Sequence, residues 1–476
     1  MVRHMASAVD HVLFLVADQW RADALGFLGA PGVQTPHLDA LAAEAVAFTN
    51  HWCQASPCGP SRSSLLTGTP VATHGQWTNE IIADHELTTL AEAARGAGIT
   101  PMLIGYTDTP QPDLESGEPG LPYDPAFELI RPYFWQRGWP AYRAFLQQSG
   151  YGEIPAGLAG VYPIDGEPDA SGLAPSATRA EDSDVAWLTD AALEVIQSRP
   201  ERSLLHLNWL RPHPPNVAAR PYHRLVDPAD VDLGKRPLPL AKQLDSHPFF
   251  GAAASNRPMR EYTQRRMRIE DLTELHERHL RATYYGLIAE VDHHIGRIVA
   301  ELKAQGRYDS TLIVFGSDHG DALGDKWLYG RRGPFDGHFK VPLIVRDPRL
   351  EADPTRSNIV DDFTVNGDIM PTILDALGAE TPSTVEGTSL EAFTHGRPTK
   401  WRQHVRYDMD WSDHGGSSAE QPRRFSAIRT PEHRYVEFND LEPMLFDLTN
   451  DPDEAINRAG DPALASVQRE LSGLLT

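Results

Sequence analysis

Several features are scarce in this sequence, and each shortage excludes a class of protein. Only two of the 476 residues are cysteines, Cys53 and Cys58, too few for a disulfide framework or for a zinc site built on two cysteine pairs. The 43 lysines and arginines are outnumbered by 66 aspartates and glutamates, and the net charge of −23 argues against nucleic acid or an anionic membrane as a partner. No apolar run approaches the roughly 18 residues of a membrane-spanning helix, and residues 1–10 lack the apolar centre of a signal peptide. We therefore expect a cytoplasmic protein.

What is present is typical of a globular enzyme, with 41% hydrophobic and 23% charged residues. Short apolar runs alternate with helical patterns, which predicts an α/β fold with a mostly parallel sheet flanked by helices. We expect one large domain over residues 1–390, with insertions at about 111–180 and 216–275, and a small α+β domain over 391–476. The predicted strands of the large domain are His11–Ala17, Ile99–Ile104, Ser203–Leu210, Ser310–Phe315 and Val341–Arg346.

The segment CQASPCGPSRSSLLTG, residues 53–68, carries the strongest chemical signal. Pro60 suits the first turn of a helix, and Arg62 lies on the same helical face as Cys58, four residues earlier. A helix N-terminus offers free N–H groups and positive potential, so the segment favours an anion-binding site. A tyrosine-phosphatase-like loop needs five residues between cysteine and arginine, and here there are three. Taken alone, Cys58 could equally be a small buried side chain without chemistry.

Other polar residues come directly after predicted strands. Because the carboxyl ends of parallel strands meet at one edge of a sheet, where such sheets bind ligands, we expect these side chains to converge. Each also has a plainer interpretation, such as a helix N-cap for Asp18 or a rigid loop residue between prolines for His213. The residues are Asp18, Tyr106 with Thr107, His213, and Asp318 with His319.

The pattern C-x-P-S-R-x-x-x-L-T-G from Cys58 resembles the signature of the sulfatases within the alkaline phosphatase superfamily, and motifs in the family's order extend from Val12 to Asp453. The resemblance implies an alkaline-phosphatase-like fold. It also implies that a formylglycine-generating enzyme converts Cys58 to formylglycine, whose hydrate supplies a nucleophilic oxygen. Asp18-Gln19 and the Gly-Tyr-Thr at residues 105–107 are similar to the phosphonate monoester hydrolase branch and its promiscuous arylsulfatase relatives.

The same resemblance implies a role for each site residue. One divalent ion, Mn²⁺ or Ca²⁺, is implied at Asp18, Gln19, Cys58, Asp318 and His319. The implied catalytic residues are Cys58, Arg62, His213 as general acid, and Arg331, which stands where the family has a lysine. The implied substrate-binding residues are Asn79, Tyr106, Thr107 and Asp108. Asp108 departs from the branch, which tends to have threonine there.

We favour hydrolysis of sulfate monoesters, as in an arylsulfatase, with promiscuity toward phosphonate monoesters and phosphate diesters. The uncharged pair Tyr106-Thr107 suits such monoanions. A primary phosphonate monoester hydrolase or phosphodiesterase is the alternative within this class. A hydrolase that uses the Cys58 thiol directly with His213, and a non-catalytic binding homologue, are alternatives from other classes. We expect a small anionic ester as substrate and a homodimer or homotetramer.

Overall fold

The structure is a computed structural model. It describes residues 9–110, 122–134, 138–169, 171, 173–199, 201–255, 262, 267–412 and 422–475.

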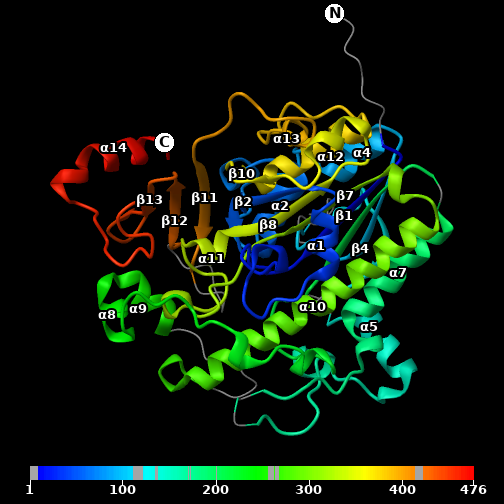
Figure 1. Ribbon diagram of the computed structural model, residues 1–476, viewed down its shortest axis with the longest axis horizontal. Helices are drawn as coiled ribbons and strands as arrows, with labels where there is room; N and C mark the ends of the chain where they lie inside the picture. Colours follow the sequence, from blue (N-terminus) through cyan, green and yellow to red (C-terminus); the bar gives the residue numbers. More distant parts are fainter. Residues whose placement is uncertain are drawn as a thin grey trace, which may run out of the picture.

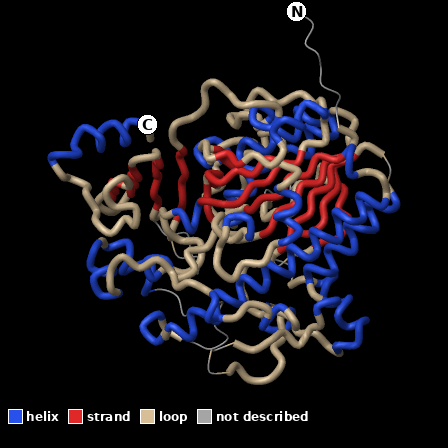
Figure 2. Tube along the Cα trace, in the orientation of Figure 1, coloured by secondary structure: helices blue, strands red, loops and turns tan. Residues whose placement is uncertain are grey.

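A nine-stranded sheet forms the centre of the molecule (Figures 1 and 2). Along the sheet the order is β10-β2-β8-β7-β1-β6-β4-β5, and β9 also pairs with β2. Among these strands only β8 runs antiparallel to its neighbours. The strands are β1 (His11–Ala17), β2 (Val46–Trp52), β4 (Thr100–Gly105), β5 (Glu128–Pro132), β6 (Ser203–Trp209), β7 (Thr311–Ser317), β8 (Lys340–Arg346), β9 (Ile359–Val360) and β10 (Thr364–Val365).

Helices cover both faces of this sheet, which explains its continuous apolar strands. On one face pack α1 (Pro36–Ala42), α7 (Asp184–Ser198) and the 31-residue α10 (Glu274–Ala304) (Figure 1). On the other pack α2 (Cys58–Thr67), α4 (Leu90–Gly96), α12 (Ile369–Leu377) and α13 (Glu391–Thr394). The remaining helices are α3 (Val71–His74), α5 (Pro140–Leu146), α6 (Leu158–Val161), α8 (Leu240–Ser246), α9 (Pro248–Ser255), α11 (Asp336–Phe339) and α14 (Ala465–Gly473).

The register of the central strands brings the predicted site residues together. Ala17, the last residue of β1, pairs with Trp209 on one side and with Ser317 on the other. Asp18 and Asp318 therefore leave adjacent parallel strands at the same edge of the sheet, as the sequence predicts.

A second, smaller sheet lies in the C-terminal region. Its antiparallel strands are β11 (Val405–Asp410), β12 (Arg424–Arg429), β13 (His433–Phe438) and β14 (Met444–Asp447). Its fifth strand comes from far away in the sequence, because β3 (Ala55–Ser56) pairs in parallel with residues 408–409 of β11. The chain that leads into α2 is thus held by the second sheet.

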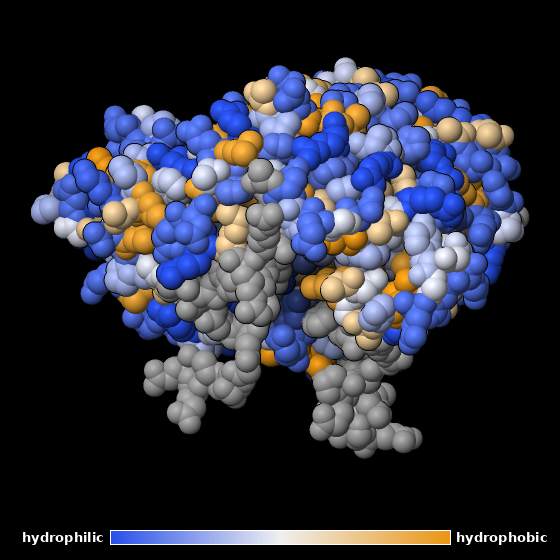
Figure 3. Space-filling model, turned by 90° about the horizontal axis from the view of Figure 1, so that it is seen from below, coloured by the Kyte–Doolittle hydropathy of each residue, from blue (hydrophilic) through white to orange (hydrophobic). Residues whose placement is uncertain are grey.

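The predicted α/β fold class is confirmed, whereas the boundary near residue 390 stays a prediction. The described part of the predicted insertion at about 111–180 contains the edge strand β5 and the helices α5 and α6. The segment 216–275 contributes α8 and α9. Among the described residues, no helix combines the length and apolarity needed to cross a membrane. The face seen in Figure 3 is mostly hydrophilic, with its hydrophobic residues in small separate groups.

Candidate metal and catalytic site

Cys58 lies at the start of α2 in a tightly enclosed position and is only 3% exposed. The next residue must be glycine, because a Cβ at Gly59 would lie 2.5 Å from Nε2 of Gln76 and 2.8 Å from the carbonyl oxygen of Asp108. The N–H of Gly59 donates to Oδ1 of Asn79 at 2.9 Å. Asn79 therefore fixes the first turn of the helix that carries Cys58.

Four buried side chains form a compact cluster at this point. One ligand atom each from Asp18, Cys58, Asp318 and His319 lies within 4.8 Å of all the others. Nε2 of His319 is 3.2 Å from Sγ of Cys58, and its Nδ1 is 3.0 Å from the carbonyl oxygen of Gly320. A carbonyl can only accept, so Nδ1 carries the proton and the lone pair of Nε2 faces the cluster. Two carboxylates and an imidazole suit Mn²⁺ or a similar divalent ion.

Gln19 completes this donor set with an oriented amide oxygen. Its Nε2 donates to Oδ2 of Asp321 at 2.5 Å and to the hydroxyl of Tyr262 at 3.0 Å, while its backbone N–H donates to Oδ1 of Asp318. Its Oε1 is buried and has no hydrogen-bond partner among the described residues. A buried orphan carbonyl oxygen next to two carboxylates fits a cation ligand. Gln19 also has a φ of 66°, a strained conformation of the kind that collects at functional sites.

Arg62 balances the charge of the two carboxylates. It is 2% exposed, its Nε donates to Oδ2 of Asp318 at 2.9 Å, and its Nη2 donates to Oδ2 of Asp18 at 3.2 Å. Burial acts to raise the pKa of Asp18, but the guanidinium of Arg62 and the hydrogen bond from Tyr106 oppose it, and that pKa lies below its ordinary value. Arg62 thus keeps Asp18 ionised.

Tyr106, Thr107 and Asp108 are all buried beside this cluster. The Tyr106 hydroxyl donates to Oδ2 of Asp18 at 2.5 Å and accepts from Nη2 of Arg62 at 3.1 Å. It therefore links the Asp18 carboxylate to the Arg62 guanidinium. Oγ1 of Thr107 accepts from Thr109, and Asp108 adopts a φ of 51°. The contact of these three side chains with substrate stays a prediction.

His213 and Arg331 face each other across the site. Nη1 of Arg331 lies 2.6 Å from Nε2 of His213, and Nδ1 of His213 lies 2.6 Å from the carbonyl oxygen of Pro214. A guanidinium only donates, so Nε2 accepts and Nδ1 carries the proton. Lys326, five residues before Arg331, points away from the site and donates to the carbonyl oxygens of Asp453 and Glu454.

The environment of Cys58 does not favour a free thiolate. Burial raises the pKa of the thiol well above its ordinary value, Arg331 opposes this, and the carboxylates of Asp18, Asp318 and Asp108 reinforce it. This speaks against the alternative in which the unmodified thiol attacks the substrate.

Several residues that support the site escape prediction from the sequence. Asp321 orients the amide of Gln19, Asn208 accepts from Nη1 of Arg62 at 2.6 Å, and Asn366 donates to the carbonyl oxygen of Asp318 at 3.2 Å. Asn208 could have been noticed in the sequence, because it is a polar side chain within the apolar strand β6.

Comparisons with known proteins agree with this geometry. A family model described as Sulfatase matches residues 10–379, and one described as N-sulphoglucosamine sulphohydrolase, C-terminal, matches residues 324–476. The multifunctional alkaline phosphatase superfamily protein PehA of Trinickia caryophylli is 34% identical, over 97% of this chain and 93% of its own. The crystal structure of a phosphonate monoester hydrolase from Agrobacterium radiobacter has a TM-score of 0.90 at 32% identity and covers 98% of this chain and 94% of its own. Phosphonate monoester hydrolase SpPMH from Silicibacter pomeroyi has a TM-score of 0.85 at 36% identity, with the same coverage of both chains. The chain therefore belongs to the sulfatase family and is a hydrolase that acts on ester bonds.

Proposed function

We propose that this protein hydrolyses esters with a single negative charge, phosphonate monoesters and phosphate diesters first and sulfate monoesters second. The likeness to two phosphonate monoester hydrolases supports placing the phosphorus esters first. It reverses the order of preference drawn from the sequence, but not the class of substrate. All three ester types are monoanions near neutral pH, so one site can accept them all.

The observation that carries this proposal is the balance of buried charge around Cys58. The charges of Asp18, Asp318 and Asp108 act on Cys58 against Arg331, and Arg62 binds the first two of these carboxylates. The two charges of a divalent ion, together with those of Arg62 and Arg331, would exceed the charges of these three carboxylates by one. A monoanionic substrate would neutralise that excess, whereas a dianion would leave a buried negative charge uncompensated.

Two groups implied by the family would complete the site. A divalent ion held by Asp18, Asp318, His319 and the Gln19 amide oxygen would polarise a substrate oxygen and lower the pKa of an attacking hydroxyl. Formylglycine made from Cys58 would provide that hydroxyl. The orphan Oε1 of Gln19 and the free lone pair of His319 fit such an ion.

The remaining residues orient the substrate and move the proton. Arg62 and Tyr106 hold Asp18 in place, and Asn79 fixes the turn that presents position 58. Nη1 of Arg331 donates to Nε2 of His213, and the guanidinium of Arg331 can also donate to a substrate oxygen. For His213 to protonate the leaving oxygen, its Nε2 must take up a proton, which requires Arg331 to turn its N–H toward the substrate anion.

The experiment that tests this function compares kcat/KM for an aryl phosphonate monoester, an aryl sulfate and an aryl phosphate monoester. The protein is matured with a formylglycine-generating enzyme, and Cys58→Ala serves as the blank. We expect activity in the order phosphonate, sulfate, phosphate monoester, with loss of activity in a chelator and resistance to thiol alkylation. No activity above the blank on any of the three would refute the proposal, and sensitivity to alkylation would favour the thiol alternative.

A charge variant tests the reason for the preference. Asp108→Asn removes one buried negative charge, so the rate with the dianionic phosphate monoester should rise relative to the phosphonate. Asp375→Asn is the matched control, because it makes the same substitution at an exposed position of α12. Equal ratios in both variants would contradict the charge argument.

A further inference from the structure

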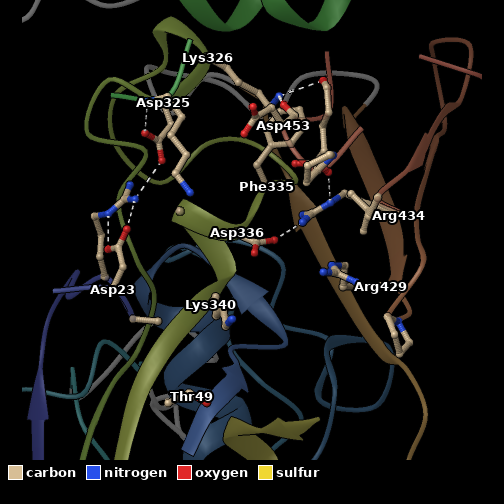
Figure 4. A pocket seen from close by; sticks show the side chains of 18 of the residues that line it. Asp23, Thr49, Asp325, Lys326, Phe335, Asp336, Lys340, Arg429, Arg434 and Asp453 are labelled. Carbon is tan, nitrogen blue, oxygen red and sulfur yellow. Dashed lines mark hydrogen bonds and ion pairs between the residues drawn. The ribbon is translucent and has the colours of Figure 1, made fainter. Parts of the chain in front are cut away.

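A cavity of about 440 Å³ lies between the central sheet and the second sheet, apart from the site described above (Figure 4). Its walls come from Lys340 at the start of β8, Asp336 of α11, and Arg429 and Arg434 of β12 and β13. None of the residues named above for the metal or substrate lines it.

The cavity also opens on the opposite face of the central sheet from the nucleophile helix. Side chains alternate along a strand, so Lys340 shares its face with Ile344, which packs in the cluster under α1, α7 and α10. Leu343 and Val345 point to the other face and pack with Leu65 and Leu66 of α2. A ligand bound to Lys340 would therefore lie on the face of β8 that is opposite to α2.

Two of the cations that line the cavity form no hydrogen bond or ion pair with an acid among the described residues, although the charge of Asp336 acts on both. Nε and Nη1 of Arg429 are buried and make no hydrogen bond within the described part of the chain. Nζ of Lys340 likewise has neither a hydrogen bond nor an ion pair with any described residue. Burial lowers the pKa of both groups, the charge of Arg429 lowers the pKa of Lys340 further, and the charge of Asp336 opposes both shifts. Both side chains are half-buried, so an anion bound directly to them would make favourable charge-assisted hydrogen bonds.

The nearby acids bond directly to a different arginine. Asp336 forms a short ion pair with Arg434, and Glu454 lies 2.6 Å from Nε of the same arginine. Figure 4 shows the bond between Asp336 and Arg434, with Arg429 and Lys340 close by and unbonded. The side chain of Asp336 is 48% exposed, so the space beside it is open to a small ligand.

We propose that this cavity binds a small inorganic oxyanion, phosphate or sulfate, between Lys340 and Arg429. The planar guanidinium of Arg429 can donate two parallel hydrogen bonds to such an anion, and Lys340 adds a point charge. The bound anion would join β8 of the central sheet to β12 of the second sheet. It would thereby stabilise the contact between the two sheets.

Thermal unfolding of the full chain tests this proposal, in chloride and with added sodium phosphate or sodium sulfate at constant ionic strength. The melting temperature should rise in a saturable way with at least one of the two anions, and the anion that acts identifies the ligand. The double variant Lys340→Met/Arg429→Met should lose this rise. It should be at least as stable as the wild type in chloride, because it removes two half-buried cations that form no direct ion pair. Lys242→Met, the same substitution at an exposed lysine, should behave as the wild type.

An anion can also bind at the reaction site, so a second measurement separates the two sites. The inhibition constant of phosphate against ester hydrolysis should be the same in the wild type and in the double variant. The proposal is overturned if the wild type shows no saturable rise, if the double variant keeps it, or if the double variant is destabilised in chloride and phosphate alike. The last result would show that the two cations balance the charge of Asp336 and do not bind a ligand.

Discussion

Replacing Arg62 by leucine tests how the buried charges of the site are balanced. In the wild type this guanidinium contacts one oxygen of Asp18 and one of Asp318, and all three side chains are at most 2% exposed. Leucine leaves both carboxylates buried without a cation. Breaking a buried ion pair typically costs about 3–5 kcal/mol, so we expect the free energy of unfolding of the metal-free protein to fall by about that amount.

A divalent ion should reduce this loss, because it neutralises the same carboxylates. The difference in free energy of unfolding between the wild type and Arg62→Leu, measured by urea unfolding, should therefore be smaller with Mn²⁺ than with a chelator. This difference in free energy of unfolding should also depend on pH. Arg62 helps to depress the pKa of Asp18, so its stabilising effect is complete above the unfolded pKa of about 4 and disappears on acidification below it.

Arg434→Leu is the matched control, because Arg434 is also about 1% exposed and is paired with two acids, Asp336 and Glu454. These acids lie outside the metal cluster, so this variant should lose stability by a similar amount with or without the ion. The reasoning is refuted if Arg62→Leu loses the same stability with Mn²⁺, with chelator and at every pH. Arg62 would then act by packing over the ring of Tyr106, which lies 4.3 Å from its guanidinium carbon.

Three further changes test neighbouring contacts. Tyr106→Phe removes the hydroxyl that donates to Asp18, and the affinity for Mn²⁺, measured by titration of chelated protein, should fall about 10- to 100-fold; an unchanged affinity would show that the hydroxyl is dispensable. Asn79→Ala frees the N–H of Gly59 at the start of α2 and should lower the free energy of unfolding by about 0.5–2 kcal/mol, unless water replaces the lost acceptor. Burial raises the pKa of Glu290 to about 7, so stability should fall as pH rises from about 4 to that value. Glu290→Gln should abolish this slope in melting curves, and a slope that persists would assign it to another group.

The strands that carry the site were predictable because both of their faces are buried. β1, β6 and β7 begin and end within two residues of the apolar runs seen in the sequence. The edge strand β5 has only half-buried residues, and its composition therefore lacks such a run. The antiparallel direction of β8 could not be predicted, because a strand buried on both faces has the same apolar pattern in either direction.

The site residues were predictable by position, but their contacts were not. Asp18 and Asp318 converge because their strands are adjacent, which the order of strands in the chain only suggests. The amide of Gln19 is held by Asp321, 302 residues away, and Nε2 of His213 accepts from Arg331, 118 residues away. Contacts over such separations depend on register and side-chain rotamers, which local sequence does not determine.

The pairing of β3 with β11 has a consequence for the timing of maturation. Cys58 is 3% exposed once the chain has folded, so an enzyme that converted it to formylglycine would have to reach it earlier. The two residues of β3 cannot complete their pairing until β11 emerges about 350 residues later, which takes roughly 20–70 s at 5–20 residues per second. During synthesis the segment before α2 therefore lacks its last neighbour for most of a minute. For that interval the chain that leads into α2 is not yet held by the second sheet.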